Sequence, residues 1–327
     1  MKASHFTIGT LVLLLTSGAT VSRAEVLHDR VNGPLIGRFG LPDSSEGANL
    51  LSSGTFAWGI SYGVASHSID QESGAELLYL DGETSRADLR VRYGVADNWE
   101  LGIDLPWVGH SGGRLDGLID AWHDAFQLPE GQRPDRDQNV LQFLYADSAD
   151  VPVDVTRSAS GVGDVRLLAA RRVINGNHNG AFRVSVKFAT GDAENFLGSG
   201  GTDFSVGWAS DYSSLFGSDR WNAFYRLNML YLGEPEVLAD RTRQWAGQVT
   251  AGAGFDLTSS IELRLQAGWR SALYDSEINY LGRSSTTLTF GGNIQLGDRY
   301  QLSLAIGEDA DVTSAPDVSF LLALRYR

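Results

Sequence analysis

Apolar and polar residues alternate strictly over segments of about ten to fifteen residues that recur along most of the chain. Between Leu89 and Val95 every odd position is apolar or aromatic, whereas the even positions hold two arginines and a glycine. The segments Phe182–Phe188 and Ile261–Trp269 repeat this arrangement. Successive side chains of a strand point to opposite faces of the sheet. Each segment therefore predicts a β-strand with one apolar and one polar face.

Twelve such segments follow one another, separated by clusters of Gly, Asn, Asp and Ser. The predicted strands are 54–68, 84–96, 98–108, 161–174, 180–190, 202–213, 219–232, 242–257, 260–272, 283–296, 299–307 and 317–327. The connections between them are alternately short and long, which is typical of outer-membrane barrels with tight periplasmic turns and extended outer loops. We therefore predict an all-β protein, a transmembrane antiparallel β-barrel of about 12 strands over residues 54–327.

A water-soluble β-sandwich would also show alternation, but three features argue against it. Strands of a sandwich are usually five or six residues long, and a sandwich core could not hold unpaired Arg, Glu and Gln. Aromatic residues at strand ends suit the interfacial girdles of a membrane barrel instead. The strand-end residues in question are Trp99, Trp107, Trp221, Tyr231 and Trp245.

Residues 1–24 have the pattern of a secretory signal peptide. Lys2 precedes a short apolar run, and small residues precede Glu25, where we expect cleavage to leave the new N-terminus. That run is about half the roughly 20 residues a transmembrane helix needs. We therefore expect a protein exported to the bacterial outer membrane.

Composition and charge narrow the classes of partner. Loss of residues 1–24 would leave 24 basic and 40 acidic residues, since only Lys2 and Arg23 are lost from the 26 basic ones. Such a polyanion is a poor ligand for nucleic acid. The chain has no cysteine, so no disulfide holds the fold. We expect no cofactor.

The last predicted strand has an alternating apolar face that ends in Tyr326, one residue before the chain end. It is similar to the terminal signal by which outer-membrane barrels are assembled. The barrel-assembly machinery is therefore an expected partner, together with outer-membrane lipid.

The longest connection, about 109–160, predicts a short helix between strands three and four. One apolar stripe at helical spacing consists of Leu115, Leu118, Ile119, Trp122 and Phe126. We expect this stripe to cover the barrel mouth or inner wall as a lid, with the lipid surface as the alternative.

The opposite side of that helix carries Asp120, His123 and Asp124, which are weak candidates for a metal site because such a face is usually only solvated. Acidic residues also crowd the other outer connections, where bridging cations of lipopolysaccharide could bind. The largest of these groups is Asp70, Glu72, Glu76, Asp81 and Glu83. We predict no metal site from these patterns.

Residues 25–53 precede the first strand and are punctuated by Gly and Pro, so no regular element is predicted there. They form either a periplasmic segment or a short plug.

The polar strand face is predicted to line the lumen and is net basic. The candidate lumen-lining residues are Arg90, Arg92, Glu100, Asp104, Asp164, Arg166, Arg172, Arg183, Lys187, Arg226, Glu262, Arg264 and Arg270. A basic pore favours anions, so one hypothesis is a channel for small solutes. The other is a structural or surface-interaction barrel whose charges pair with one another in an occluded lumen.

An enzyme is the least favoured class. Lipid hydrolases need Ser and His side chains close together, and the sole neighbouring pair at a plausible outer strand end is His110 and Ser111. Adjacent strand residues point to opposite faces, so no catalytic residue is assigned.

Several short motifs resemble the domain of unknown function 3187 family of outer-membrane β-barrels. They are Gly33-Pro34-Leu35, Gly40-Leu41-Pro42, the stretch from Leu118 to Arg133, Gly161-Val162-Gly163-Asp164-Val165 and Ala189-Thr190-Gly191-Asp192. The last two are also similar to outer-membrane proteins of phenol meta-cleavage pathways. The resemblance implies the barrel fold and, through the second group, aromatic solutes as a further candidate.

Overall fold

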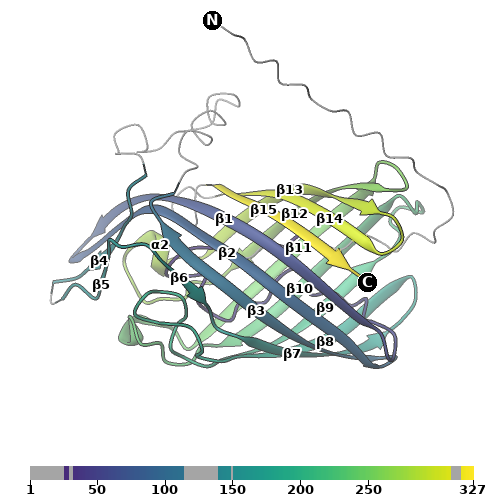
Figure 1. The fold of residues 1–327 in the computed structure, drawn as a ribbon, viewed down its shortest axis with the longest axis horizontal. Coiled ribbons are helices and arrows are strands. Elements are labelled where there is room, and N and C mark those ends of the chain that lie inside the picture. Colours follow the sequence, from purple (N-terminus) through teal and green to yellow (C-terminus); the bar gives the residue numbers. More distant parts are fainter. Residues whose placement is uncertain (1–25, 29–31, 114–138, 149, 311–317) are drawn as a thin grey trace, which may run out of the picture.

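The computed structural model describes residues 26–28, 32–113, 139–148, 150–310 and 318–327. Twelve antiparallel strands form a closed barrel (Figure 1). The ring closes where the first strand pairs with the last, from Trp58 opposite Tyr326 to Ser66 opposite Val318. The predicted fold class and strand number are confirmed.

The barrel strands lie close to their predicted positions. They are β1 (Phe56–Ser73), β2 (Glu76–Ala96), β3 (Trp99–Ser111), β7 (Arg166–Ile174), β8 (His178–Lys187), β9 (Asp203–Tyr212), β10 (Trp221–Tyr231), β11 (Trp245–Asp256), β12 (Ile261–Arg270), β13 (Ser285–Leu296), β14 (Tyr300–Asp309) and β15 (Val318–Tyr326). Each pairs with its neighbour along the chain, apart from the closure.

The apolar face of the strands points outward and the charged face inward. On β2, Leu89 and Tyr93 are exposed on the outer surface, whereas Arg90 and Arg92 are buried. An outer surface of this kind suits a lipid environment. Aromatic pairs mark its two borders, with Trp221 against Phe255 near one end and Tyr231 against Trp245 near the other.

The two ends of the barrel differ. One end, here called the turn end, carries the five short connections, the start of β1 and the chain's C-terminus. The other, called the loop end, carries the remaining connections and three short strands, β4 (Gln142–Ala146), β5 (Val153–Val155) and β6 (Ala159–Val162). It also carries a 3-10 turn, η2 (Ala239–Arg241), and the helix α2 (Asn279–Gly282). The described residues include no helix long and apolar enough to cross a membrane.

Two predicted boundaries differ from the structure. The first connection at the loop end was expected to be long, but β1 and β2 continue to Ser73 opposite Glu76 and turn tightly at Gly74, whose φ is 60°. The alternation of apolar and polar residues continues into this hairpin, where Leu78 and Leu80 are buried on one face. The many acidic residues of the segment made that alternation hard to recognise in the sequence.

The fourth predicted strand is split into β6 and β7. Gly163 and Asp164 lie in the gap between them, where the backbone N–H of Gly163 donates to Pro106 O. A side chain at Gly163 would come 2.9 Å from Leu197 O, so the chain bends where only glycine fits. The helix predicted within 109–160 lies outside the described residues, as do Leu115, Leu118, Ile119, Trp122 and Phe126.

Candidate functional site

Residues 26–28 and 32–53, called the plug below, run through the inside of the barrel. Leu27 is fully buried and its carbonyl oxygen accepts a hydrogen bond from Gln266 on β12. The backbone N–H of Gly40 donates to Asp203 on β9, and that of Leu51 donates to Glu100 on β3. The plug therefore contacts strands on several sides of the barrel.

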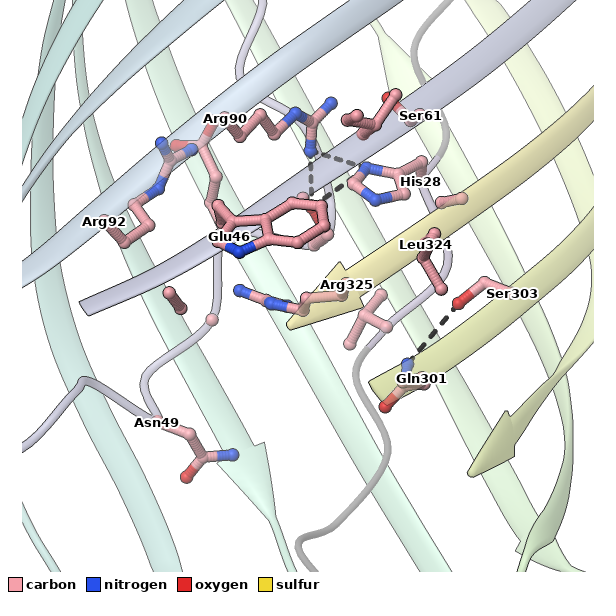
Figure 2. A pocket seen from close by; sticks show the side chains of 18 of the residues that line it. His28, Glu46, Asn49, Ser61, Arg90, Arg92, Gln301, Ser303, Leu324 and Arg325 are labelled. Carbon is pink, nitrogen blue, oxygen red and sulfur yellow. Dashed lines mark hydrogen bonds between the residues drawn. The ribbon is translucent and has the colours of Figure 1, made fainter. Parts of the chain in front are cut away.

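Two acidic side chains of the plug bind the basic wall halfway along the lumen. Asp43 accepts from Arg90 Nη2 at 3.0 Å. Glu46 forms ion pairs with Arg166 and, at 3.7 Å, with Arg183. All five side chains are buried. Arg90 also reaches His28 of the plug, as Figure 2 shows.

The wall itself supplies carboxylates to the same cluster. Asp104 lies 2.7 Å from Arg92 and 2.5 Å from Arg166. Glu100 lies 3.3 Å from Arg183. Asp88, between Arg86 and Arg90, completes the group. Together with Asp43 and Glu46 of the plug, these side chains form a buried group of ion pairs, called the arginine cluster below. Its wall residues are Arg86, Asp88, Arg90, Arg92, Glu100, Asp104, Arg166 and Arg183.

Most of the other predicted lumen residues form ion pairs outside the arginine cluster. Lys187 sits between Asp164 and Asp203, at 2.8 and 3.1 Å. Arg226 pairs with Asp211, and Arg264 with Glu262.

Two predicted lumen arginines bond to backbone oxygens instead. Arg270 is buried and donates to the carbonyl of Ser271. Arg172 is only half-buried and donates to Asp97 O in a turn, so it lies at the turn end of the barrel.

Sequence reasoning missed the plug partners of these arginines. Asp43 and Glu46 stand in a segment without periodicity, so no pattern placed them opposite Arg90 and Arg166. The one available signal was their position three residues apart in a Gly- and Pro-rich stretch next to the first strand.

The loop end is sealed by apolar side chains. The tip of the plug contributes Leu35, Ile36, Phe39 and Leu41 to one buried cluster, called the outer cluster below. Its other members come from the β1–β2 hairpin and four loop-end connections: Ile69, Leu78, Leu80, Phe143, Tyr145, Val153, Phe196, Leu230, Leu232, Leu238, Ala246, Leu273, Tyr274, Ile278, Tyr280 and Leu281.

Towards the turn end the interior is hollow. A cavity of about 710 Å³, open to solvent, is lined by Glu46 and the cluster arginines Arg90, Arg92 and Arg183 (Figure 2). A second cavity of about 950 Å³, also open, lies beside Asp211 and Arg226. Among the described residues, apolar packing therefore occupies the loop end of the interior, and cavities open to solvent lie towards the turn end.

Glu76, at the tip of the β1–β2 hairpin, ties the loop-end connections together. It accepts from Tyr145 Oη at 3.1 Å and from Arg241 Nη1 at 2.6 Å. It also accepts from Ser276 Oγ and from the backbone N–H of Glu277. Both Glu76 and Glu83 are buried, so these two acids, unlike exposed Glu72, are not available on the surface to bind cations.

The two Gly-Asp motifs noted in the sequence meet in space. Asp164 accepts from the backbone N–H of Thr190 at 3.0 Å and of Gly191 at 2.9 Å. It also accepts from Ser199 N and pairs with Lys187. Asp164 thereby anchors the β8–β9 connection to the barrel wall.

The histidines do not assemble a hydrolase site in the described part of the chain. His110 is buried, with its ring nitrogens near Thr84 Oγ1 and Phe196 O, while Ser111 is exposed. The described residues contain no group of three His, Cys, Asp or Glu side chains that could hold a metal. The weak metal candidates Asp120, His123 and Asp124 lie outside the described residues.

Residues 8–327 match the model of the family described as "Protein of unknown function (DUF3187)". The chain belongs to this family. None of the curated proteins matches the sequence.

Among solved structures, the COG4313 outer membrane channel from Pseudomonas putida F1 is similar to this DUF3187 protein, with a TM-score of 0.53 and 15% identity over 84% of this chain and 95% of that one. The NanC porin gives a TM-score of 0.47 at 8% identity, covering 84% of this chain and 100% of its own. The CymD monoaromatic hydrocarbon channel gives 0.40 at 11%, covering 84% and 89%. The first similarity shows that this chain has the fold of an outer-membrane barrel.

Proposed function

We propose that this protein is an outer-membrane channel for small solutes, closed in this conformation by its own plug. The observation that carries the proposal is that the described plug residues, 26–28 and 32–53, lie inside a charged lumen without joining the sheet of its wall. A segment held by side-chain contacts can leave without breaking a strand ladder. The cavities on its turn-end side then become part of a continuous path.

The proposal includes location and orientation. Residues 1–24 direct export, the turn end faces the periplasm and the loop end faces the outside, beside lipopolysaccharide. The terminal strand β15, whose Tyr326 stacks on Trp58 across the barrel closure, serves as the assembly signal. This orientation follows the usual placement of short turns and chain ends in such barrels.

The solute class follows from the wall. Arginines line the middle of the lumen, which favours anions. Aromatic solutes are the second candidate, because Phe39, Phe196 and Tyr274 stand where a solute would enter.

Deletion of residues 32–50 tests the proposal. In planar bilayers we expect the deleted protein to give stepwise, anion-selective current, and the full-length protein to give far less. Heat-modifiable migration on gels shows that the barrel is folded. A folded, deleted barrel that carries no current would contradict the proposal.

A structural barrel with an occluded lumen is the second candidate. The observation that favours it is the number of buried ion pairs between plug and wall, together with the outer cluster. It predicts no current in the same experiment.

A further inference from the structure

The plug places two carboxylates beside wall arginines that outnumber the wall carboxylates around them. Among the described residues, the wall part of the arginine cluster holds five guanidinium groups, of Arg86, Arg90, Arg92, Arg166 and Arg183, against three carboxylates, of Asp88, Glu100 and Asp104. Asp43 and Glu46 of the plug supply the two missing negative charges.

We infer that the arginine cluster is a binding site for a small dicarboxylate solute, and that Asp43 and Glu46 occupy this site until such a solute displaces them. The inference rests on the proposed channel, and it names the solute class and the event that opens the plug.

The two plug carboxylates lie close enough to be replaced by one molecule. Glu46 Oε1 accepts a hydrogen bond of 3.3 Å from the backbone N–H of Asp43, so its carboxylate folds back beside that residue. One side of the pair binds Arg90 and the other binds Arg166. A small molecule with two carboxylates can present one to Arg90 and the other to Arg166, and guanidinium groups bind carboxylates more strongly than neutral oxygens.

Charge explains why opening would need the solute. If the plug left alone, Arg90 would keep only Asp88 at 4.0 Å and Arg166 only Asp104 at 2.5 Å. Five guanidinium groups would then share three carboxylates in a buried cluster, which is unfavourable. A dicarboxylate that takes the place of Asp43 and Glu46 removes this cost. Plug release and anion binding are therefore coupled in the same way that any ligand stabilises the state it binds.

The arginine cluster borders a cavity that opens to solvent. Glu46, Arg90, Arg92 and Arg183 line this cavity, so an anion inside it contacts the same guanidinium groups as the plug. Figure 2 shows Arg90 and Arg92 projecting from the wall, with Arg90 bonded to His28 of the plug.

A cysteine at position 48 can report plug release, because the chain has no native cysteine. Ala48 is fully buried against Ala170, Ala181 and Ala209 of the wall, so Ala48→Cys should react with a maleimide only when the plug moves. At succinate concentrations ten times its dissociation constant, we expect labelling to become about tenfold faster. Uncharged succinamide should have no effect. Ser53→Cys, on an exposed plug residue, controls for effects on the reagent.

The charge-neutral variant Asp43→Asn/Glu46→Gln provides the second measurement. Combined with Ala48→Cys, it should label rapidly without succinate, and calorimetry should show tighter succinate binding than in the full-length protein with native charges. Equal effects of succinate and succinamide, or no succinate binding in either protein, would overturn the inference. The deletion of residues 32–50 would still conduct in that case, so the channel proposal is judged separately.

Discussion

At the residue scale, individual buried charges act as anchors rather than as pore lining. Asp164 was predicted to line the lumen from its place on the polar face of a strand. Its carboxylate instead accepts three backbone N–H groups and pairs with Lys187. The alternation of polar and apolar residues predicts the face of the sheet on which Asp164 lies. It does not predict the partners of Asp164, because Thr190 and Ser199 belong to a connection without such alternation.

Replacing Asp164 should loosen this connection. Asp164→Ala leaves Lys187 with one carboxylate fewer and three N–H groups without acceptors, so we expect a loss of about 3–5 kcal/mol in the free energy of unfolding. Urea titration in detergent micelles measures it. Asp154→Ala, at an exposed position of β5, is the matched control and should change little. A loss in Asp164→Ala no larger than in the control would show that Asp164 is not an anchor.

Glu76 makes the loop end sensitive to acid. It lies at the hairpin tip, beyond the roughly ten residues that a strand needs to cross a membrane. Burial alone would raise the pKa of this carboxyl, but hydrogen bonds from Ser276 and from the backbone of Glu277 lower the pKa below its ordinary 4.5. The stabilisation is therefore complete above pH 4.5 and is lost as pH falls through the lowered value.

Pepsin digestion between pH 5 and about 2 can detect this loss. In the native protein we expect cleavage of the loop-end connections to accelerate as pH falls below the ordinary pKa of Glu76. Glu76→Gln should be cleaved faster at pH 5 and depend less on pH, because its amide does not titrate. Glu72→Gln, with an exposed side chain nearby, should behave like the native protein. A pH profile that Glu76→Gln leaves unchanged would assign the effect to another group.

At the scale of elements, the strands were predictable and the plug was not. Strand positions follow from alternation, which every barrel strand must keep because one face meets lipid and the other water. The plug shows no periodic pattern of apolar and polar residues. Its conformation is set by contacts with wall residues such as Arg90 and Asp203, which are distant in sequence. The tight β1–β2 turn was missed because acids in 70–83 hid the continued alternation.

The plug is held at its tip by apolar packing as well as by charge. Phe39 is buried and contacts Tyr274 edge to face at 5.7 Å. We expect Phe39→Ala to cost about 3–5 kcal/mol of packing free energy and thereby to raise the rate at which Cys at position 48 is labelled. Phe216→Ala removes a ring that is 92% exposed and should leave the rate unchanged. Equal labelling in both variants would mean that the outer cluster does not hold the plug.

At the scale of the whole molecule, the described residues form a closed barrel with an internal plug and an apolar cluster at the loop end. The chain has a net charge of −14, whereas the middle of the lumen collects arginines. This segregation of charge was visible in the sequence, because the polar faces of the strands are net basic. The filling of the lumen was not visible in the sequence, because it depends on how residues 26–28 and 32–53 pack against the wall.

The most direct test of a movable plug is to lock it in place. An ideal Cβ at Gly40 lies 3.1 Å from Cβ of Asp203, so Gly40→Cys/Asp203→Cys brings two cysteines close to the separation that a disulfide needs. Each single variant is the control for its own substitution. In a planar bilayer the account predicts no current from the oxidised double variant and stepwise current after a reductant is added. Equal current before and after reduction, with the disulfide shown to be formed, would contradict the claim that plug movement opens this barrel.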